Sequence, residues 1–448
     1  MKFYTLRIQA FFTTLLLVEL LLLIPAWLCA DTLHVPDEFP TVSAAMNAAS
    51  PGDEVLVGPG WYNESVVMSP GVSLVGAGPD STLIDGGPSP AIVCAEGSSV
   101  GQLRLISGST LATLYSQDVS ATIWSNEVSG LGSGILCTGG TIVAVGNSLH
   151  DNYYSGILVH GCDARIDQNL AYFNDIDGIL CFQSRVEITG NFCFGNAHAG
   201  INCRKGTVAD VEGNVTQSNH HTGVFFIRST GSALGNDSSR NAQMGFQAVD
   251  STDVTLESNS IIENFQHGVR LSNSSGRVLG CTVRCNGSAG IYITNGSDIV
   301  VSGNILERNF SGGVLIERNA NAVLMNDYYH RNYTSGLSVL SSATAETANE
   351  TMLEDRLNGL YCEQANHVTL RRCMLLRSHW MGIASIDSQV EMSNCVVAGT
   401  FFNGVSSQGS SFEVSNNVFF AIPLACILCQ DPGPHTIVNN IFSNAEHA

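Results

Sequence analysis

The sequence contains few charged residues. Asp, Glu, Lys and Arg make up 13% of its 448 positions, well under the roughly 25% of an ordinary globular protein. Positive charge is the scarcer kind, since 19 Lys and Arg stand against 39 Asp and Glu and the formal net charge is −20. This balance argues against a protein that binds nucleic acid through a basic face. With 44% apolar residues the chain is also unlike a disordered protein, and it lacks the composition of a helical array.

Long apolar runs are absent after residue 30, so no later segment is expected to cross a bilayer. At the N-terminus, Lys2 and Arg7 precede an apolar run over residues 11–28 that ends near small residues suited to cleavage. We interpret residues 1–30 as a secretory signal peptide and expect a secreted, periplasmic or cell-surface protein. Glu19 inside the run leaves an uncleaved membrane anchor as the alternative.

Glycine followed by an apolar residue recurs every 22 or 23 residues along most of the chain. The thirteen glycines are Gly134, Gly156, Gly178, Gly200, Gly223, Gly245, Gly268, Gly290, Gly313, Gly336, Gly359, Gly382 and Gly404. An Asn stands four residues before the glycine in nine consecutive units, from Asn152 to Asn332. A second Asn series, from Asn147 to Asn304, stands nine residues before it. So many copies in phase indicate a stacked repeat architecture.

Each repeat has room for three short strands and no helix. Positions one and three after the glycine are apolar, as in Ile157 and Val159, which is strand alternation. Residues 185–189 supply a second strand and residues 304–308 a third. This pattern predicts an all-β, single-stranded parallel β-helix with about 22–23 residues per coil. Each residue then stacks on its equivalent one coil later, about 4.8 Å away.

The recurrent Asn and Gly have physical roles in such a coil. Stacked Asn side chains are expected to face inward and to hydrogen-bond from one coil to the next as ladders. We also expect the ladder Asn to hold the left-handed backbone conformation of a tight corner. The recurring Gly is expected at a corner that has no space for a Cβ atom.

The chain is expected to be one domain with a capped N-terminal end. Thr41 can N-cap a short helix whose apolar face is built from positions within residues 42–49. We therefore assign residues 31–51 to an N-terminal cap and residues 52–448 to the β-helix, with regular coils at about 134–420. Such a cap protects the open edge of a solenoid.

The repeat resembles the right-handed parallel β-helix repeats of the pectate-lyase-like superfamily, and most closely those of the NosD type and of carbohydrate-binding proteins and sugar hydrolases. The segment Gly-Asp-Glu-Val-Leu-Val-Gly-Pro-Gly-Trp-Tyr-Asn-Glu at residues 52–64 is similar to the opening of many exported members. The resemblance covers about residues 33–444 and implies a right-handed coil. The Asp-Pro-His-Asp motif of alginate-epimerase-like members is missing, because residues 431–435 read Asp-Pro-Gly-Pro-His. No catalytic residue is therefore carried over from the resemblance.

Titratable side chains gather at equal offsets in neighbouring coils and should form one surface strip. The candidate catalytic residues are Asp177, His198, Arg204, Lys205, His221, Arg228 and Arg270. Elimination from a uronic acid needs a base for the C5 proton and positive charge for the developing enolate, and this set contains both. The strip predicts a polysaccharide lyase or epimerase-like enzyme. The alternative interpretation is a solvated surface without catalytic function.

Aromatic residues at the outward position two residues after the glycine are candidates for sugar stacking. They are Phe225, Tyr292 and Tyr361, three coils apart each time. The alternative interpretation is the ordinary strand propensity of aromatic residues at exposed positions. The predicted partner is a carbohydrate polymer, bound by a monomer. Because the −20 charge repels polyanions, neutral or Ca²⁺-bridged glycans are easier ligands, and Ca²⁺ is the cofactor to consider.

The cysteines do not indicate a metal site. The C-x-x-C pair at 426–429 is isolated among apolar residues, whereas zinc sites show two such pairs or added His. Cys181 and Cys203 share a register on adjacent coils, as do Cys373 and Cys395. Their expected Cα spacing lies within the disulfide range, which leaves both bonded and free thiols open.

Three hypotheses for function follow from the sequence and the resemblance. The first is an exported enzyme that processes a polysaccharide, as a lyase or epimerase does. The second is a non-catalytic binding or surface protein. The third, which the resemblance to NosD repeats implies, is a periplasmic accessory protein for copper-site assembly.

Overall fold

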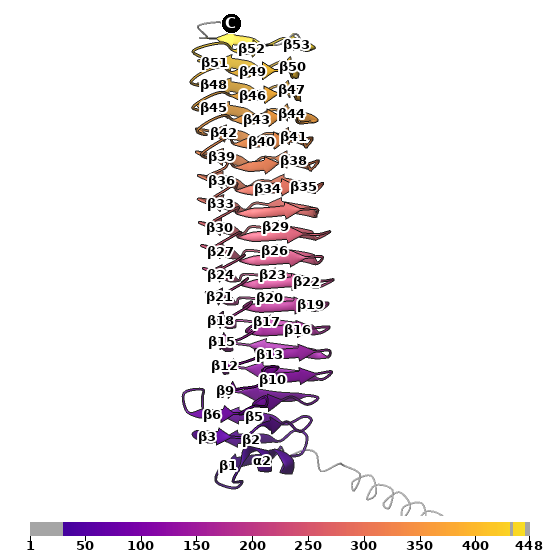
Figure 1. Ribbon diagram of the computed structural model, residues 1–448, viewed down its shortest axis with the longest axis vertical. Helices are drawn as coiled ribbons and strands as arrows, with labels where there is room; N and C mark the ends of the chain where they lie inside the picture. The colour runs from indigo at the N-terminus through magenta and orange to yellow at the C-terminus, as the bar shows by residue number, and fades with distance from the viewer. Residues whose placement is uncertain (1–29, 431–432, 444–448) are drawn as a thin grey trace, which may run out of the picture.

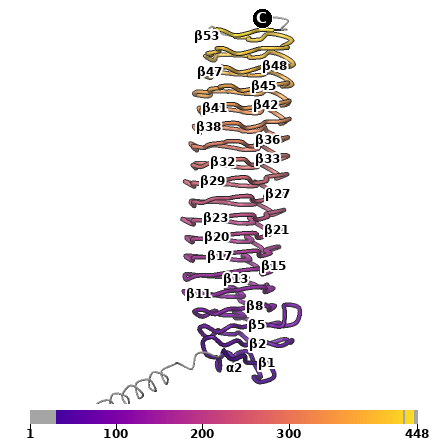
Figure 2. The backbone as a smooth tube through the Cα atoms, turned by 180° about the vertical axis from the view of Figure 1, so that it is seen from behind, coloured from indigo at the N-terminus to yellow at the C-terminus, as the bar shows by residue number. Residues whose placement is uncertain are grey.

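The computed structural model describes residues 30–430 and 433–443. The expected signal peptide falls almost wholly on residues 1–29, which lie outside the described residues. The described chain forms a long, straight stack of coils with its two ends at opposite ends of the rod (Figure 1). Figure 2 shows the same rod from behind, with each coil lying on the coil before it.

Each coil contributes one strand to each of three parallel sheets, A, B and C. In one coil, β18 (Leu170–Tyr172) belongs to sheet B, β19 (Ile179–Phe182) to sheet C and β20 (Arg185–Thr189) to sheet A. β19 pairs residue for residue with β22 (Ile201–Arg204) of the next coil. Sheet A alone contains 19 strands among the described residues. The predicted parallel β-helix with three short strands per coil is confirmed.

The strands that matter for the sites below lie in sheets B and C. The further sheet C strands are β16 (Ile157–His160), β25 (Val224–Ile227), β28 (Phe246–Val249), β31 (Val269–Ser272) and β34 (Ile291–Thr294). The further sheet B strands are β36 (Ile305–Glu307), β39 (Tyr328–His330), β42 (Thr351–Leu353) and β45 (Met374–Leu376). The turn that joins each sheet B strand to the next sheet C strand is called the B–C corner; in one coil it comprises residues 173–178.

The core runs along the axis of the rod. Ile157, Val159, Ile179 and Cys181, at the predicted inward positions, are all completely buried. Burying one Ile or Val side chain contributes about 1.5–3 kcal/mol. Because each coil repeats the same inward positions, the hydrophobic core is one continuous column.

The predicted Asn ladders are present and lie inside the coil. The Nδ2 of Asn174 donates to the Oδ1 of Asn196 at 2.9 Å, and the Nδ2 of Asn196 donates to the Oδ1 of Asn219 at 3.0 Å. Each ladder amide also reaches a backbone carbonyl of the preceding coil, as Asn196 Nδ2 does at the Ala171 O, 3.0 Å away. The buried amides inside the ladder are thereby paired, which offsets the cost of burying them, whereas the Oδ1 of Asn152 at the end of its ladder has no partner.

The expectation that the ladder Asn hold the left-handed backbone is wrong. Positive φ is found at the residue before the Asn, as in Phe173 (φ 52°) and Ser218 (φ 54°). The left-handed residue turns the chain, and the following Asn then points its side chain inward. The predicted crowding at the corner glycine is correct, since a Cβ at Gly178 would lie 2.7 Å from the Gly200 carbonyl oxygen.

A short helix covers the N-terminal end, as expected. Helix α2 (Val42–Ala48) begins after Thr41, whose Oγ1 accepts a hydrogen bond from the Ala44 N at 3.1 Å. The Glu64 carboxylate, from the next coil, accepts hydrogen bonds from two further backbone N–H groups at the start of this helix. The helix lies at the end of the rod beside the first coils (Figure 1), and its apolar residues Val42, Ala45 and Met46 are buried. Along the described part of the chain, no helix is both long and apolar enough to span a membrane.

Candidate functional site

A buried carboxylate lies in the B–C corner that leads into β19. Asp177 is 0% exposed, and its Oδ1 accepts hydrogen bonds from the His198 Nδ1 at 2.6 Å and from the Ala199 N at 2.9 Å. The Nδ2 of Asn202 reaches both carboxylate oxygens, at 3.2 and 3.1 Å. These donors satisfy the buried charge. Because a carboxylate accepts only, neutral His198 carries its proton on Nδ1 and has a lone pair on Nε2.

A second histidine packs on this dyad. His198 and His221 occupy equal positions in successive coils, and their rings stack with centroids 4.4 Å apart and planes 21° apart. Burial is the main cause that lowers the pKa of His221 to about 4, and the positive Arg204 guanidinium adds to this effect. His221 is therefore neutral at neutral pH and holds the His198 ring in place by stacking. Phe225 packs behind the pair, 5.8 Å from the His221 ring centroid.

Positive charge is coupled to the dyad through an amide. Asn202 donates to Asp177 through its Nδ2, and its Oδ1 accepts a hydrogen bond from the Arg204 Nε at 2.9 Å. Asn202 and Arg204 both point outward from β22, so the amide joins the carboxylate to the guanidinium on one face of sheet C. The Phe182 ring of the preceding coil lies 5.9 Å from the guanidinium carbon.

The other predicted catalytic residues are not part of this cluster. Lys205 follows Arg204 directly, and its Nζ and the Arg204 guanidinium carbon lie 5.7 and 5.9 Å from the same Phe182 ring centroid. Lys205 is therefore close to Arg204, but it is not part of the hydrogen-bonded network around Asp177. Arg228 follows β25 at an exposed turn and forms an ion pair with Asp250 at 3.6 Å.

Arg270 lies on β31, three sheet C strands or about 14 Å along the rod from β22. Its Nε is buried without a hydrogen-bond partner, as is the Nδ1 of the neighbouring His267. Burial and the adjacent Arg270 lower the pKa of His267 to about 4. Arg270 and His267 thus form a separate cluster from the Asp177–His198 dyad.

The predicted sugar-stacking residues are less available than expected. Phe225 is only 8% exposed because the His pair and its neighbours cover it, so its ring offers no open face. Tyr292 is half-buried, stacks on a histidine and donates its OH to the Glu317 Oε1 at 2.6 Å. Tyr361 donates its OH to the Glu363 Oε2 at 2.8 Å. Side chains of the B–C corner partly cover the outward position of the strand. The alternation of residues along a single strand does not reveal this cover.

A group of exposed aromatic rings lies instead in the B–C corner, three residues before the glycine. Its members are Tyr153, Phe265, Phe310, Tyr333 and Phe401, with exposed fractions between 39% and 77%. The Phe310 and Tyr333 rings stack with centroids 5.6 Å apart. Their shared offset from the recurring glycine is visible in the sequence and is the signal that could have found them.

Cysteines and acidic groups form no evident metal centre. Among residues 30–430 and 433–443, no group of three or more His, Cys, Asp or Glu side chains is arranged to hold a metal ion. Cys181 and Cys203 pair in register on adjacent strands, but both are free thiols, as are Cys373 and Cys395. Of the two outcomes that the spacing allows for these pairs, the structure has the unbonded one.

Two family models match parts of the sequence. One, described as right handed beta helix region, matches residues 268–419, and the other, described as periplasmic copper-binding protein (NosD), matches residues 97–236. The three parallel sheets agree with both. The chain is a right-handed β-helix repeat protein. No curated protein matches it.

Several solved structures are similar to this β-helix repeat protein. The periplasmic alginate epimerase AlgG is 10% identical, with a TM-score of 0.41, over 72% of this chain and 77% of that one. The A-module of the Azotobacter vinelandii mannuronan C-5 epimerase AlgE6 is 14% identical, with a TM-score of 0.31, over 90% and 94%. The catalytic domain of a GH87 alpha-1,3-glucanase is 12% identical, with a TM-score of 0.31, over 93% and 69%.

The dyad gives the β-helix repeat protein a defined chemical capacity. The Nε2 of His198 can accept a proton, since Asp177 holds the opposite nitrogen and stabilises the resulting imidazolium. The Arg204 guanidinium, tied to the same carboxylate through Asn202, supplies positive charge for an anion that forms nearby. Base and cation therefore lie together on one face of the rod.

Proposed function

We propose that this protein is exported, binds a carbohydrate polymer along the B–C corner, and removes a proton from it with the Asp177–His198 dyad. The observation that carries the proposal is the 2.6 Å bond between the Asp177 Oδ1 and the His198 Nδ1, which leaves the Nε2 of a partly exposed imidazole available to a substrate. The exposed rings of Phe265 and Phe310 along the same corner support sugar stacking. The match to a periplasmic family over residues 97–236 supports export.

The step fits a uronic acid residue of the polymer. The C5–H bond breaks, the proton goes to the His198 Nε2, and the electron pair enters an enolate that the Arg204 guanidinium stabilises. Expulsion of the glycosidic oxygen at C4, with a proton from solvent, gives an unsaturated product, as in a lyase. Reprotonation of C5 from the opposite face gives the epimer instead. His221 is neutral and adds no charge that would oppose protonation of His198.

The test is turnover of defined polymers by matched variants. Polygalacturonate, alginate and a neutral glucan are incubated with the protein, and products are followed by the ultraviolet absorbance of unsaturated uronates and by NMR of sugar configuration. Product is expected from a uronate polymer with the unchanged protein, and none with His198→Gln or Asp177→Asn. His367→Gln removes a histidine from sheet A and should leave turnover intact.

Two results would overturn the catalytic assignment. One is product formation by His198→Gln at the rate of the unchanged protein, and the other is binding without product for every uronate polymer. The second result would support the non-catalytic binding protein. Thermal melting of each variant verifies that it is folded.

A second candidate function is a periplasmic accessory role in copper-site assembly, which the NosD match favours. The stacked His198 and His221 rings lie inside the matched segment and are the side chains to examine. If this role applies, calorimetric titration with Cu²⁺ should give a stoichiometric heat of binding. That heat should disappear in the double variant His198→Gln/His221→Gln. Absence of binding would exclude it.

A further inference from the structure

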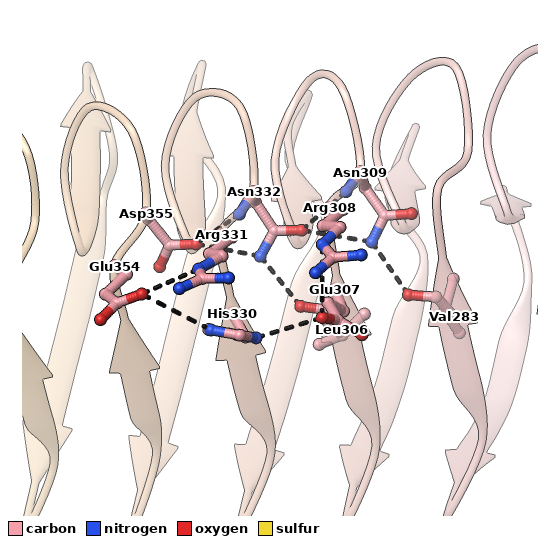
Figure 3. Close-up of polar contacts among 10 residues, drawn as sticks. All are labelled: Val283, Leu306, Glu307, Arg308, Asn309, His330, Arg331, Asn332, Glu354 and Asp355. Carbon is pink, nitrogen blue, oxygen red and sulfur yellow. Dashed lines mark hydrogen bonds and ion pairs between the residues drawn. The ribbon is translucent and has the colours of Figure 1, made fainter.

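A hollow lies in the B–C corner, nearer the C-terminal end of the rod than the Asp177–His198 dyad. It has a volume of about 310 Å³. It is lined by Arg308, Arg331, Tyr333, Glu354, Arg356 and His379. Arg308 and Arg331 occupy equal positions in successive coils, directly after β36 and β39, and Figure 3 shows both side chains beside the Asn ladder.

The arginines of the pocket differ in whether a carboxylate neutralises them. The Arg331 Nε lies 2.8 Å from the Glu354 Oε2, and the Arg308 Nε lies 3.5 Å from the Glu307 Oε1. His330 bridges these two carboxylates (Figure 3). Within the described chain, Arg356 has no carboxylate within 4.0 Å, although it lines the same hollow.

Arg356 is held for binding by an aromatic ring. Its guanidinium carbon lies 3.9 Å from the centroid of the Tyr333 ring. This stacking fixes the guanidinium plane and leaves its N–H edges available to an acceptor. Three guanidinium groups and the Glu354 carboxylate line the hollow, and the Glu307 carboxylate lies beside Arg308. These five groups carry one net positive charge, that of the unpaired Arg356, on a chain whose net charge is −20. At physiological salt, screening over about 8 Å lets this local field dominate inside the hollow.

We propose that this pocket binds a tetrahedral oxyanion, a sulfate or phosphate group carried on a larger ligand. Arg308 and Arg331 stand at equal positions of successive coils, about 4.8 Å apart along the rod, and Arg356 stands two residues further along the corner of the next coil. A tetrahedral anion has oxygens that point in several directions, so it can accept hydrogen bonds from all three guanidinium groups. A planar carboxylate is satisfied by the two parallel N–H groups of one guanidinium. Glu354 keeps Arg331 in place and Tyr333 keeps Arg356 in place, so the anion meets a preorganised site.

The pocket is independent of the proposed catalytic dyad. Arg356 precedes Gly359 and His198 precedes Gly200, which places the two sites seven coils, or about 34 Å, apart along the same corner. Occupancy of the pocket therefore does not need the dyad, and the two proposals can fail separately. His198→Gln should bind the oxyanion as the unchanged protein does.

The test measures binding by calorimetry with three probes that share one sugar ring: glucose 6-sulfate, glucose 6-phosphate and glucuronate. We expect the sulfate or the phosphate ester to bind at least about tenfold more tightly than glucuronate. The ester that binds better identifies the group that the natural ligand carries. Arg356→Gln should weaken this binding about tenfold. Arg356→Lys, which retains the charge but loses the planar fork, should give an intermediate loss.

Arg277→Gln is the matched control, since Arg277 lies on β32 (Ser275–Leu279) of sheet A, outside the hollow. It should bind like the unchanged protein. Equal affinity of Arg356→Gln and the unchanged protein would overturn the proposal, as would equal binding of glucuronate. An equal loss of affinity in Arg277→Gln would show that the overall charge of the protein, and not the pocket, causes the effect, and would also overturn the proposal. Thermal melting confirms that each variant is folded.

Discussion

Asp177 and His198 belong to successive coils and are 21 residues apart in sequence, yet the Asp177 Oδ1 and the His198 Nδ1 are 2.6 Å apart. The carboxylate is completely buried, whereas about a third of the imidazole is exposed. A buried acceptor and a partly exposed base on adjacent coils thus form a dyad. The geometry depends on the stacking of two corners, not on any motif within one of them.

The first prediction concerns His221, whose pKa burial and nearby positive charge lower to about 4. Its imidazole should remain neutral from pH 8 down to about pH 5. The unfolded chain binds this proton below pH 6.5, so the His221 contribution lowers folding stability as the pH falls from 6.5 towards 4. NMR titration of the imidazole signal, assigned by its loss in His221→Gln, measures the midpoint. A midpoint near 6.5 would contradict the buried stack.

The second prediction concerns the Asn ladder. The side chain of Asn196 accepts from the N and Nδ2 of Asn174 and donates to Asn219 and to the Ala171 carbonyl. Asn196→Ala leaves buried partners unsatisfied and should lower the free energy of unfolding by about 3 kcal/mol or more. Urea denaturation followed by circular dichroism measures this loss. Asn63→Ala at an exposed position is the control, and a similar loss there would refute a special role for the ladder.

The third prediction concerns the carboxyl that ends one ladder. Asp355 Oδ1 accepts from the Asn332 N and Nδ2 at 2.9 and 3.0 Å, as a ladder Asn would, while its buried Oδ2 has no partner (Figure 3). Burial raises the pKa of Asp355 to about 7. When protonated, Oδ2 can donate as the amide of Asn332 does to the Leu306 carbonyl. The neutral acid thus replaces an amide in the ladder.

The stabilising contribution of protonated Asp355 is complete below about pH 3.8 and is lost as the pH rises to about 7, because the folded state keeps a proton that the unfolded state releases. Three pKa units correspond to about 4 kcal/mol. Asp355→Asn should therefore unfold at a higher urea concentration than the unchanged protein at pH 8, and at a similar one at pH 4. The exposed Asp253→Asn should show no such divergence. Parallel pH profiles for Asp355→Asn and the unchanged protein would disprove the prediction.

The fourth prediction concerns two thiols that face each other without a bond. Cys137 Sγ and Cys162 Sγ are 3.0 Å apart, and both residues are free. A two-electron oxidant such as diamide should link them, with both protons taken up by the reagent, because the sulfurs need to move by only about 1 Å to reach bonding distance. Alkylation and peptide mass spectrometry should show one linked pair that is absent in Cys137→Ser. Full alkylation of both thiols after oxidation would contradict this.

Much of the fold could be predicted because the sequence of a solenoid repeats with the length of its coil. The glycine spacing, the apolar pair after each glycine and the two Asn series indicate the coil length, the inward positions and the ladders. Crowding at Gly178 and the cap at Thr41 are local effects, and they too could be predicted. The backbone of the ladder Asn could not, because Asn favours both the left-handed turn and the inward hydrogen bond, and the coil places Phe173 rather than Asn174 in the turn.

The sequence by itself determined the parallel β-helix, its three strands per coil and its capped N-terminal end, since these follow from periodicity and local chemistry. Only the tertiary structure decided which outward residues act together. It joined Asp177, His198 and Arg204 in one hydrogen-bonded network, left Lys205 beside Arg204 but outside that network, and covered Phe225. The physical reason is that neighbouring coils bring together side chains that are about 22 residues apart in the sequence. Whether two such side chains touch depends on their rotamers and on the neighbours that cover them, and the repeat pattern contains neither.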